Sequence, residues 1–214
     1  RPVYFSTTVP SDQYKGLEKF FVQEGLAYRV VPVKIDQPEK GEFGMIDPDV
    51  MYDNLMNKFT WGNAGDPEVY LDENNRRMFS NFKRIFASLG KDLILKGDTA
   101  KAIEVAHRGL EIVPEQKMPN DFFTIGLAEV LIMAGSNEEG EKLLNEVLDY
   151  AKTYLESSIS LRPEDRFGLD YPMGISMQSL LDIYNLSVKL KLDSLAAVVE
   201  LDINNYYSKL YSAN

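Results

Sequence analysis

The spacing of apolar residues along the chain changes near residue 72. From there onward apolar side chains recur at helical spacing, interrupted by residues that favour turns. The segment Phe86 to Pro114, FASLGKDLILKGDTAKAIEVAHRGLEIVP, predicts a hairpin of two helices. Gly97 permits the turn, and Asp98 or Thr99 caps the second helix. We expect the two helices to cross closely at small residues such as Gly90 and Ala102.

A similar order of small and large residues returns in Asp121 to Leu148, with Ala128, the turn residue Gly135 and then Gly140. The order fits the tetratricopeptide helix-pair pattern, which repeats about every 34 residues. A third, weaker copy lacks the small residues, as expected of a terminal pair that stacks on one side only. We therefore predict a mainly α fold, a tetratricopeptide-like repeat array over residues 72–214, with helix pairs at about 73–114, 121–157 and 173–212.

Residues 1–71 follow a different pattern, which predicts a small α/β segment and then an ordered loop. β-branched and aromatic residues in 3–9 and 28–35 predict two strands. Tyr14, Leu17 and Phe21 lie near helical spacing and predict a helix between them, so the strands should be parallel. Two strands alone rarely form a stable sheet, so they should pair with preceding chain or lie against the helices. A short helix is expected at 49–58, and the rest of 36–71 is expected to wrap onto the helical part.

Charge and composition exclude several classes of partner and chemistry. The formal net charge of −10 disfavours nucleic acid and direct binding to anionic lipid. The chain has no cysteine, which excludes disulfides, thiolate metal sites and a cysteine nucleophile. No apolar run is long enough to predict a membrane-spanning helix. The chain opens on Arg1-Pro2 and enters a strand-like segment at once, which we interpret as a domain cut from a longer protein.

We find no catalytic, metal-binding or cofactor-binding pattern in the sequence. His107 is the single histidine and is most simply a partly exposed helix residue. Asp47, Asp49 and Asp53 invite a calcium interpretation, but they lack the glycine and glutamate of an EF-hand, so capping of the next helix is the plainer explanation. An independent hydrolase is the third hypothesis, although carboxylates are so numerous that a pair at glycosidase spacing is expected by chance and does not argue for one.

The first helices of stacked pairs usually line a concave groove that binds peptides. Fitting the repeat to the sequence places a set of mixed charged and apolar residues there: Arg84, Ala87, Lys91, Ile94, Phe122, Ile125, Glu129 and Ile132. With only two or three pairs, the groove could be open to a peptide or filled by residues 1–71, and we favour the second.

A polar cluster, Asp72-Glu73-Asn74-Asn75-Arg76-Arg77, stands at the expected start of the helical part. Acidic residues first and basic residues later favour a helix dipole and exposed pairs. A functional interpretation would have Asn74, Asn75 and Arg77 anchor the loop around Trp61 or contact a membrane-embedded part.

Three stretches carry a family resemblance: RPVYFSTTV (1–9), EGLAYRVVPVK (24–34) and YDNLMNKFTWGNAG..VYLDENNRRM (52–78). They resemble the soluble C-terminal part of a bacterial family of multi-spanning, glycosyltransferase-like membrane proteins similar to protein O-mannosyltransferases. The third stretch is the most specific, and its motif residues include Trp61, Tyr70, Asp72, Asn74, Asn75, Arg76 and Arg77. In that family the catalytic residues belong to the membrane part, so none is carried over to this chain.

The resemblance implies a non-catalytic, extracytoplasmic (periplasmic) domain that positions a protein partner or acceptor. Its partners would be a protein or peptide and the membrane-embedded upstream part of the same chain. The alternative is a free-standing, cytoplasmic tetratricopeptide adaptor that binds a peptide or protein.

Overall fold

The computed structural model describes residues 1–35, 45–112, 114–115 and 117–211. Within these ranges a small sheet is followed by a short helix, α1 (Pro48–Asp53), and then by six longer helices. The longer helices are α2 (Glu73–Leu95), α3 (Thr99–Glu111), α4 (Ile125–Met133), α5 (Asn137–Ser160), α6 (Asp170–Leu190) and α7 (Asp193–Tyr211). The prediction of a mainly α protein with an N-terminal strand segment is confirmed. Some residues of the predicted elements lie outside the described residues: 36–44 of the expected loop, 113 of the first pair and 212 of the third pair.

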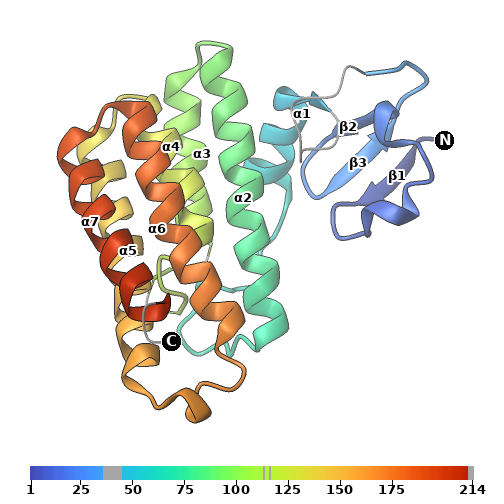
Figure 1. The fold of residues 1–214 in the computed structure, drawn as a ribbon. Helices are drawn as coiled ribbons and strands as arrows, with labels where there is room; N and C mark the ends of the chain where they lie inside the picture. Colours follow the sequence, from blue (N-terminus) through green and yellow to red (C-terminus); the bar gives the residue numbers. More distant parts are fainter. Residues whose placement is uncertain (36–44, 113, 116, 212–214) are drawn as a thin grey trace.

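The six longer helices form three consecutive pairs, α2 with α3, α4 with α5 and α6 with α7 (Figure 1). A 3₁₀ turn, η4 (Phe122–Thr124), leads into α4, and another, η5 (Pro163–Asp165), precedes α6. The helices share a continuous apolar core that includes Phe86, Leu127, Leu144 and Ile183, each of them fully buried. Whether the chain divides near residue 72 into two separate domains stays a prediction.

The turn inside each pair closes in the same way. Gly97 and Gly135 adopt positive φ angles of 83° and 100° after the first helices of pairs one and two. The next backbone N–H then donates back into the helix, from Asp98 to Leu93 and from Ser136 to Leu131, both at 2.9 Å. In the third pair Lys191 takes the left-handed position, at φ 59°. This geometry is the usual C-terminal helix stop, and only two of the three turns use the glycine that favours it.

The small residues permit close packing, but one of them does so at a different interface from the one predicted. A Cβ atom added to Gly140 would meet Ile132 of α4 at 2.5 Å, so Gly140 lies at the crossing within the second pair. A Cβ added to Gly90 would meet Val130 of α4 at 2.7 Å. The prediction that Gly90 marks a crossing inside the first pair is therefore wrong, because Gly90 lets the first pair approach the second.

The N-terminal sheet differs from the predicted strand-helix-strand unit. Its four strands are β1 (Val3–Ser6), β2 (Phe21–Gln23), β3 (Ala27–Val30) and β4 (Met45–Ile46), in the order β1-β3-β2-β4. β1 and β3 are antiparallel, with Val3 opposite Val30, so the predicted parallel pair is wrong. The sheet gains its further strands, β2 and β4, from within residues 1–71.

The predicted helix between the strands is replaced by two 3₁₀ turns, η1 (Ser11–Gln13) and η2 (Glu18–Phe20), and by β2. Lys15 and Gly16 adopt positive φ angles of 56° and 82°, which an α-helix cannot contain. Tyr14 and Phe21 instead belong to an aromatic cluster. In this cluster the Phe21 ring stacks on the Tyr28 ring, with 5.2 Å between centroids. The second predicted strand is β3, and it ends at Val30. Pro32 follows two residues later and has no backbone N–H to donate to a neighbouring strand.

The segment after the sheet ties it to the helices. Asp47 caps α1 by accepting from the Val50 N–H at 3.2 Å, and a π-helical turn, η3 (Asn54–Lys58), continues the helix. The Asn54 amide donates to the Glu24 carbonyl at 2.7 Å, which connects η3 to the sheet. Trp61 then packs against α2, with 5.4 Å between its ring centroid and that of Phe82. The sheet consequently lies beside α1 and α2, at the opposite end of the molecule from α7 (Figure 1).

Candidate functional site

A groove of about 400 Å³ lies between the first helices of the three pairs. It follows from the stacking, because α2, α4 and α6 face the same side and turn side chains toward one another. The residues that line it come from these helices and η4: Arg84, Ala87, Ser88, Lys91, Phe122, Phe123, Ile125, Gly126, Glu129, Asp182, Asn185, Leu186 and Lys189.

Most of the residues that the sequence placed in a groove lie here together. Arg84, Ala87, Lys91, Phe122, Ile125 and Glu129 line the groove. Ile94 and Ile132 do not, since Ile132 is buried and faces Gly140 of α5 and Ile94 packs against the apolar core. The α6 wall was not predicted from the sequence; it is formed by Asp182, Asn185, Leu186 and Lys189. Their spacing of three and four residues places them on one helix face and was the available signal.

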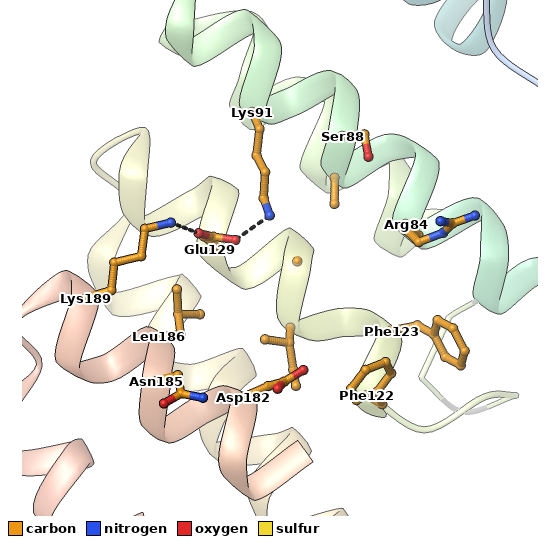
Figure 2. A pocket seen from close by; sticks show the side chains of 13 residues that line it. Arg84, Ser88, Lys91, Phe122, Phe123, Glu129, Asp182, Asn185, Leu186 and Lys189 are labelled. Atoms are coloured by element: carbon orange, nitrogen blue, oxygen red, sulfur yellow. Dashed lines mark hydrogen bonds and ion pairs between the residues drawn. The ribbon is translucent and has the colours of Figure 1, made fainter. Parts of the chain in front are cut away.

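A charged bridge spans the three first helices at one end of the groove (Figure 2). Glu129 of α4 forms ion pairs with two lysines. Its Oε2 lies 2.5 Å from Nζ of Lys91 on α2, and its Oε1 lies 2.8 Å from Nζ of Lys189 on α6. Glu129 is only 7% exposed, whereas the two lysine side chains remain 43% and 63% exposed. Burial alone would raise the pKa of Glu129, but the two ammonium groups outweigh it and hold that pKa below its usual value. Glu129 is therefore ionised and fixed in place at neutral pH.

The other end of the groove is aromatic and lies over a buried lysine. Phe122 and Phe123 stand edge to face, with 5.4 Å between ring centroids. Lys83, which is 3% exposed, donates to Thr124 Oγ1 at 3.0 Å. Burial lowers the pKa of Lys83, while the nearby charges of Asp121 and Glu115 oppose that shift. Lys83 thus holds η4 against α2 and keeps the aromatic wall in position.

Residues 1–71 do not fill this groove in the part of the chain that the structure describes. The sheet and the Trp61 segment lie against another side of α2, where Trp61 contacts Phe82 and Phe86. The expectation that the N-terminal segment occupies the groove is therefore wrong. The physical reason is that the apolar side chains before residue 72 pack on α1 and α2, and the groove stays open to a ligand.

The polar motif at the start of α2 makes local structural contacts. Asp72 caps α2 by accepting from the Asn75 N–H at 2.8 Å. Arg76 donates to the Leu71 carbonyl at 3.1 Å, and Arg77 donates to Asn74 Oδ1 at 3.3 Å. Tyr70 is largely exposed. Trp61 belongs to the aromatic contact with α2, away from these polar groups.

Two further candidates also have local partners. His107 of α3 lies 2.9 Å from Glu139 of α5 and is partly exposed, which places it between the first and second pairs. Asp98 caps α3 by accepting from the Lys101 N–H at 3.2 Å. No three His, Asp or Glu side chains of the described residues converge on a point that could hold a metal ion. None of the described helices is both long and apolar enough to cross a membrane.

Comparison with known proteins gives one match. Residues 1–50 match the sequence model of the family described as TMEM260-associated domain 2. The match suggests a link to a membrane glycosyltransferase-like protein. It covers the sheet and the start of α1 and does not reach the groove. No curated protein and no solved structure matches the chain.

Proposed function

We propose that this chain is a non-catalytic, extracytoplasmic protein-interaction domain of a glycosyltransferase-like membrane protein. Its helix pairs are a tetratricopeptide-like array, and the groove between α2, α4 and α6 binds a segment of a partner or acceptor protein. The match at residues 1–50 supports the link to such a parent protein. The open groove, with a charged end and an aromatic end, supports the interaction role.

The observation that carries the proposal is the Lys91–Glu129–Lys189 bridge on the groove wall. It joins three helices that are far apart in sequence, so it fixes their separation and gives the groove a constant width. The exposed parts of both lysines can still donate to carbonyl or carboxylate oxygens of a bound segment. The Phe122–Phe123 pair offers an apolar surface for a side chain of that segment. A polar end and an apolar end orient an extended peptide.

The same bridge argues against a hydrolase. The groove carboxylates are Glu129 and Asp182 among the described residues. A general acid must hold its proton near neutral pH, which requires a raised pKa. The lysines lower the pKa of Glu129, so it is unsuited to that role. We therefore place catalysis by the isolated chain below both interaction hypotheses.

The test is to fill the groove in the full-length natural protein. Ser88 lies on the α2 wall, and the Ser88→Trp variant would occupy the space beside Lys91 and Gly126. Ser157→Trp on the exposed face of α5 is the matched control, because it adds the same side chain away from the groove. We expect Ser88→Trp to reduce glycan transfer to the acceptor by at least about tenfold, with Ser157→Trp near wild type.

The outcomes separate the hypotheses. Unchanged transfer and an unchanged partner set in Ser88→Trp would refute the proposal, provided circular dichroism shows that the variant is folded. Loss of a bound partner with unchanged glycan transfer would favour the free-standing adaptor instead.

A further inference from the structure

A second cleft, of about 450 Å³, lies on another side of α2, between that helix and the turn that follows β1. α2 contributes Asn74, Arg77, Asn81 and Arg84, which recur at intervals of three and four residues and so share one face of the helix. Thr7 and Thr8 form the facing wall. Thr7 is fixed by its hydroxyl, which donates to the Leu26 carbonyl at 3.2 Å, so the turn holds a defined position against the sheet.

The polar lining of this cleft is cationic and rich in hydrogen-bond donors. Two guanidinium groups, two amides and two hydroxyls face it, and no carboxylate is among the described residues that line it. Arg77 donates to the neutral Asn74 amide oxygen at 3.3 Å and forms no ion pair with a described residue. A cleft lined by two arginines and no described carboxylate stands out in a chain with 33 acidic and 23 basic residues.

The orientation of Arg84 separates this cleft from the groove. Although Arg84 borders both, its guanidinium points away from Glu129 and Lys189 (Figure 2). Burial raises the pKa of the Tyr14 phenol and the charge of Glu18 adds to that rise, while the positive charge of Arg84 opposes it. Arg77 lines the second cleft and is absent from the lining of the groove, so it distinguishes the two sites.

We propose that this cleft is a binding site for a phosphate monoester. Guanidinium groups match the oxygens of phosphate in both geometry and charge, and two of them suit its dianionic form. The amide N–H groups of Asn74 and Asn81 and the Thr8 hydroxyl supply further donors to the phosphate or to the group that bears it, while the Thr7 hydroxyl stays donated to the Leu26 carbonyl. Phe82 and Ile85 form an apolar floor beneath the arginines, whose side chains remain exposed to solvent at the mouth of the cleft.

The experiment is a calorimetric titration of the folded chain with glycerol 3-phosphate at pH 7.5 and low salt. We expect saturable binding with one equivalent. Arg77→Gln should weaken it at least about tenfold, because hydrogen bonds between charged groups carry that much net affinity. Arg108→Gln is the matched control: it removes the same charge from α3, where Arg108 makes only an exposed contact with Glu111 at 3.5 Å. This control should bind within about twofold of wild type.

A second arm uses vesicles containing phosphatidic acid, which carry the same monoester on a lipid. Binding in solution identifies a soluble source of the phosphate, and binding to vesicles alone identifies a lipid source. Either supports the site if Arg77→Gln weakens it at least about tenfold. The proposal is overturned if neither probe binds, or if Arg108→Gln loses as much affinity as Arg77→Gln. A melting curve of Arg77→Gln that matches wild type shows that the loss of binding does not come from a folding defect.

Discussion

At the scale of single residues, a buried or half-buried cation donates hydrogen bonds to backbone carbonyls where the chain forms no helix or strand. The Lys117 ammonium donates to the carbonyls of Ala64, Asp66 and Val69, at 3.1 Å to Ala64 and 2.5 Å to Val69. These three carbonyls belong to the turn after Trp61, which lies on the helical core without a strand or helix of its own. One side chain therefore satisfies three backbone acceptors at once.

We predict that Lys117→Met loosens this turn. The variant keeps the aliphatic stem and loses the three hydrogen bonds, so unfolding should become easier by about 1–3 kcal/mol. Urea unfolding measures the loss, and amide exchange at residues 64–69 should quicken most. Lys142→Met on the exposed face of α5 is the control, because Lys142 makes a long ion pair with Glu146, at 3.6 Å. Equal stability of the two variants would contradict the role given to Lys117.

The groove bridge predicts how stability depends on acid. The pKa of Glu129 is lowered in the folded chain from 4.5, so its contribution is fully present above that pH. It is lost as the pH falls from 4.5 through the lowered folded pKa, because the unfolded chain takes up the proton first. Urea unfolding between pH 7 and pH 3 should show wild type more stable than Glu129→Gln at neutral pH, with the gap closing in acid. A gap that does not change with pH would be inconsistent with the bridge.

At the scale of elements, the three helix turns are alike in backbone and different in sequence. Lys191 adopts the left-handed conformation that Gly97 and Gly135 adopt at the matching points. A non-glycine residue there is strained by about 1 kcal/mol. We predict that Lys191→Gly stabilises the chain by about 0.5–1 kcal/mol, measured by thermal or urea unfolding. Gly97→Ala should shift stability by a similar amount in the opposite direction, and a loss of stability in Lys191→Gly would refute the argument.

The contact between pairs depends on Gly90. Val130 is fully buried and has no room to withdraw from a new Cβ atom, so Gly90→Ala should destabilise the chain by about 1–3 kcal/mol. Gly174→Ala in α6 is the matched control, since nothing lies within 4 Å of its Cβ position. It should gain up to about 1 kcal/mol from helix propensity. Adding Val130→Ala should restore part of the stability of Gly90→Ala, and a failure to do so would mean that the clash lies elsewhere.

Sequence patterns predicted the helices well and the sheet poorly, for a physical reason. Helix pairs are built from local spacing and local turns, so Gly97 and Gly135 were enough to place them. The sheet depends on contacts between distant residues, such as Phe5 opposite Tyr28, and on the positive φ at Lys15, which its residue type does not signal. The third pair was predicted, but its α6 wall was missed because that pair lacks the small residues by which the repeat was fitted to the sequence. The partner of Gly90 lies 40 residues away and could not be read from the spacing.

At the scale of the whole molecule, two apolar clusters of unequal size hold the chain together. The larger runs through all three helix pairs, with Trp61 packed against it, whereas the smaller centres on Tyr14, Phe21 and Tyr28 at the sheet. A small cluster buries little area and protects its hydrogen bonds less. The sheet is therefore the weaker part of the fold.

We predict that β1 and β3 exchange their amide hydrogens faster than α2 and α4. Hydrogen exchange read by mass spectrometry, with peptides covering Val3–Ser6 and Glu73–Leu95, measures the difference. Fluorescence of Trp61, the single tryptophan, should follow the helical signal in circular dichroism rather than sheet exchange, because its ring packs on Phe82 and Phe86. Equal protection in both parts would mean that the smaller cluster is as stable as the larger one.

The family match stops at residue 50, in the middle of α1. Gly25 lies within the match, whereas Phe59, which packs on Gly25, lies beyond its end. A Cβ at Gly25 would touch the Phe59 ring at 3.0 Å, so the sheet rests on a side chain that the matched stretch does not include. A fragment that ended at residue 50 would sever α1 and leave the turn between β2 and β3 without the Phe59 ring that packs on Gly25. Another protein that carries the matched 50 residues would therefore need a different side chain in place of the Phe59 ring. Such proteins should have an aromatic or bulky aliphatic residue within a few helical turns after the end of the match.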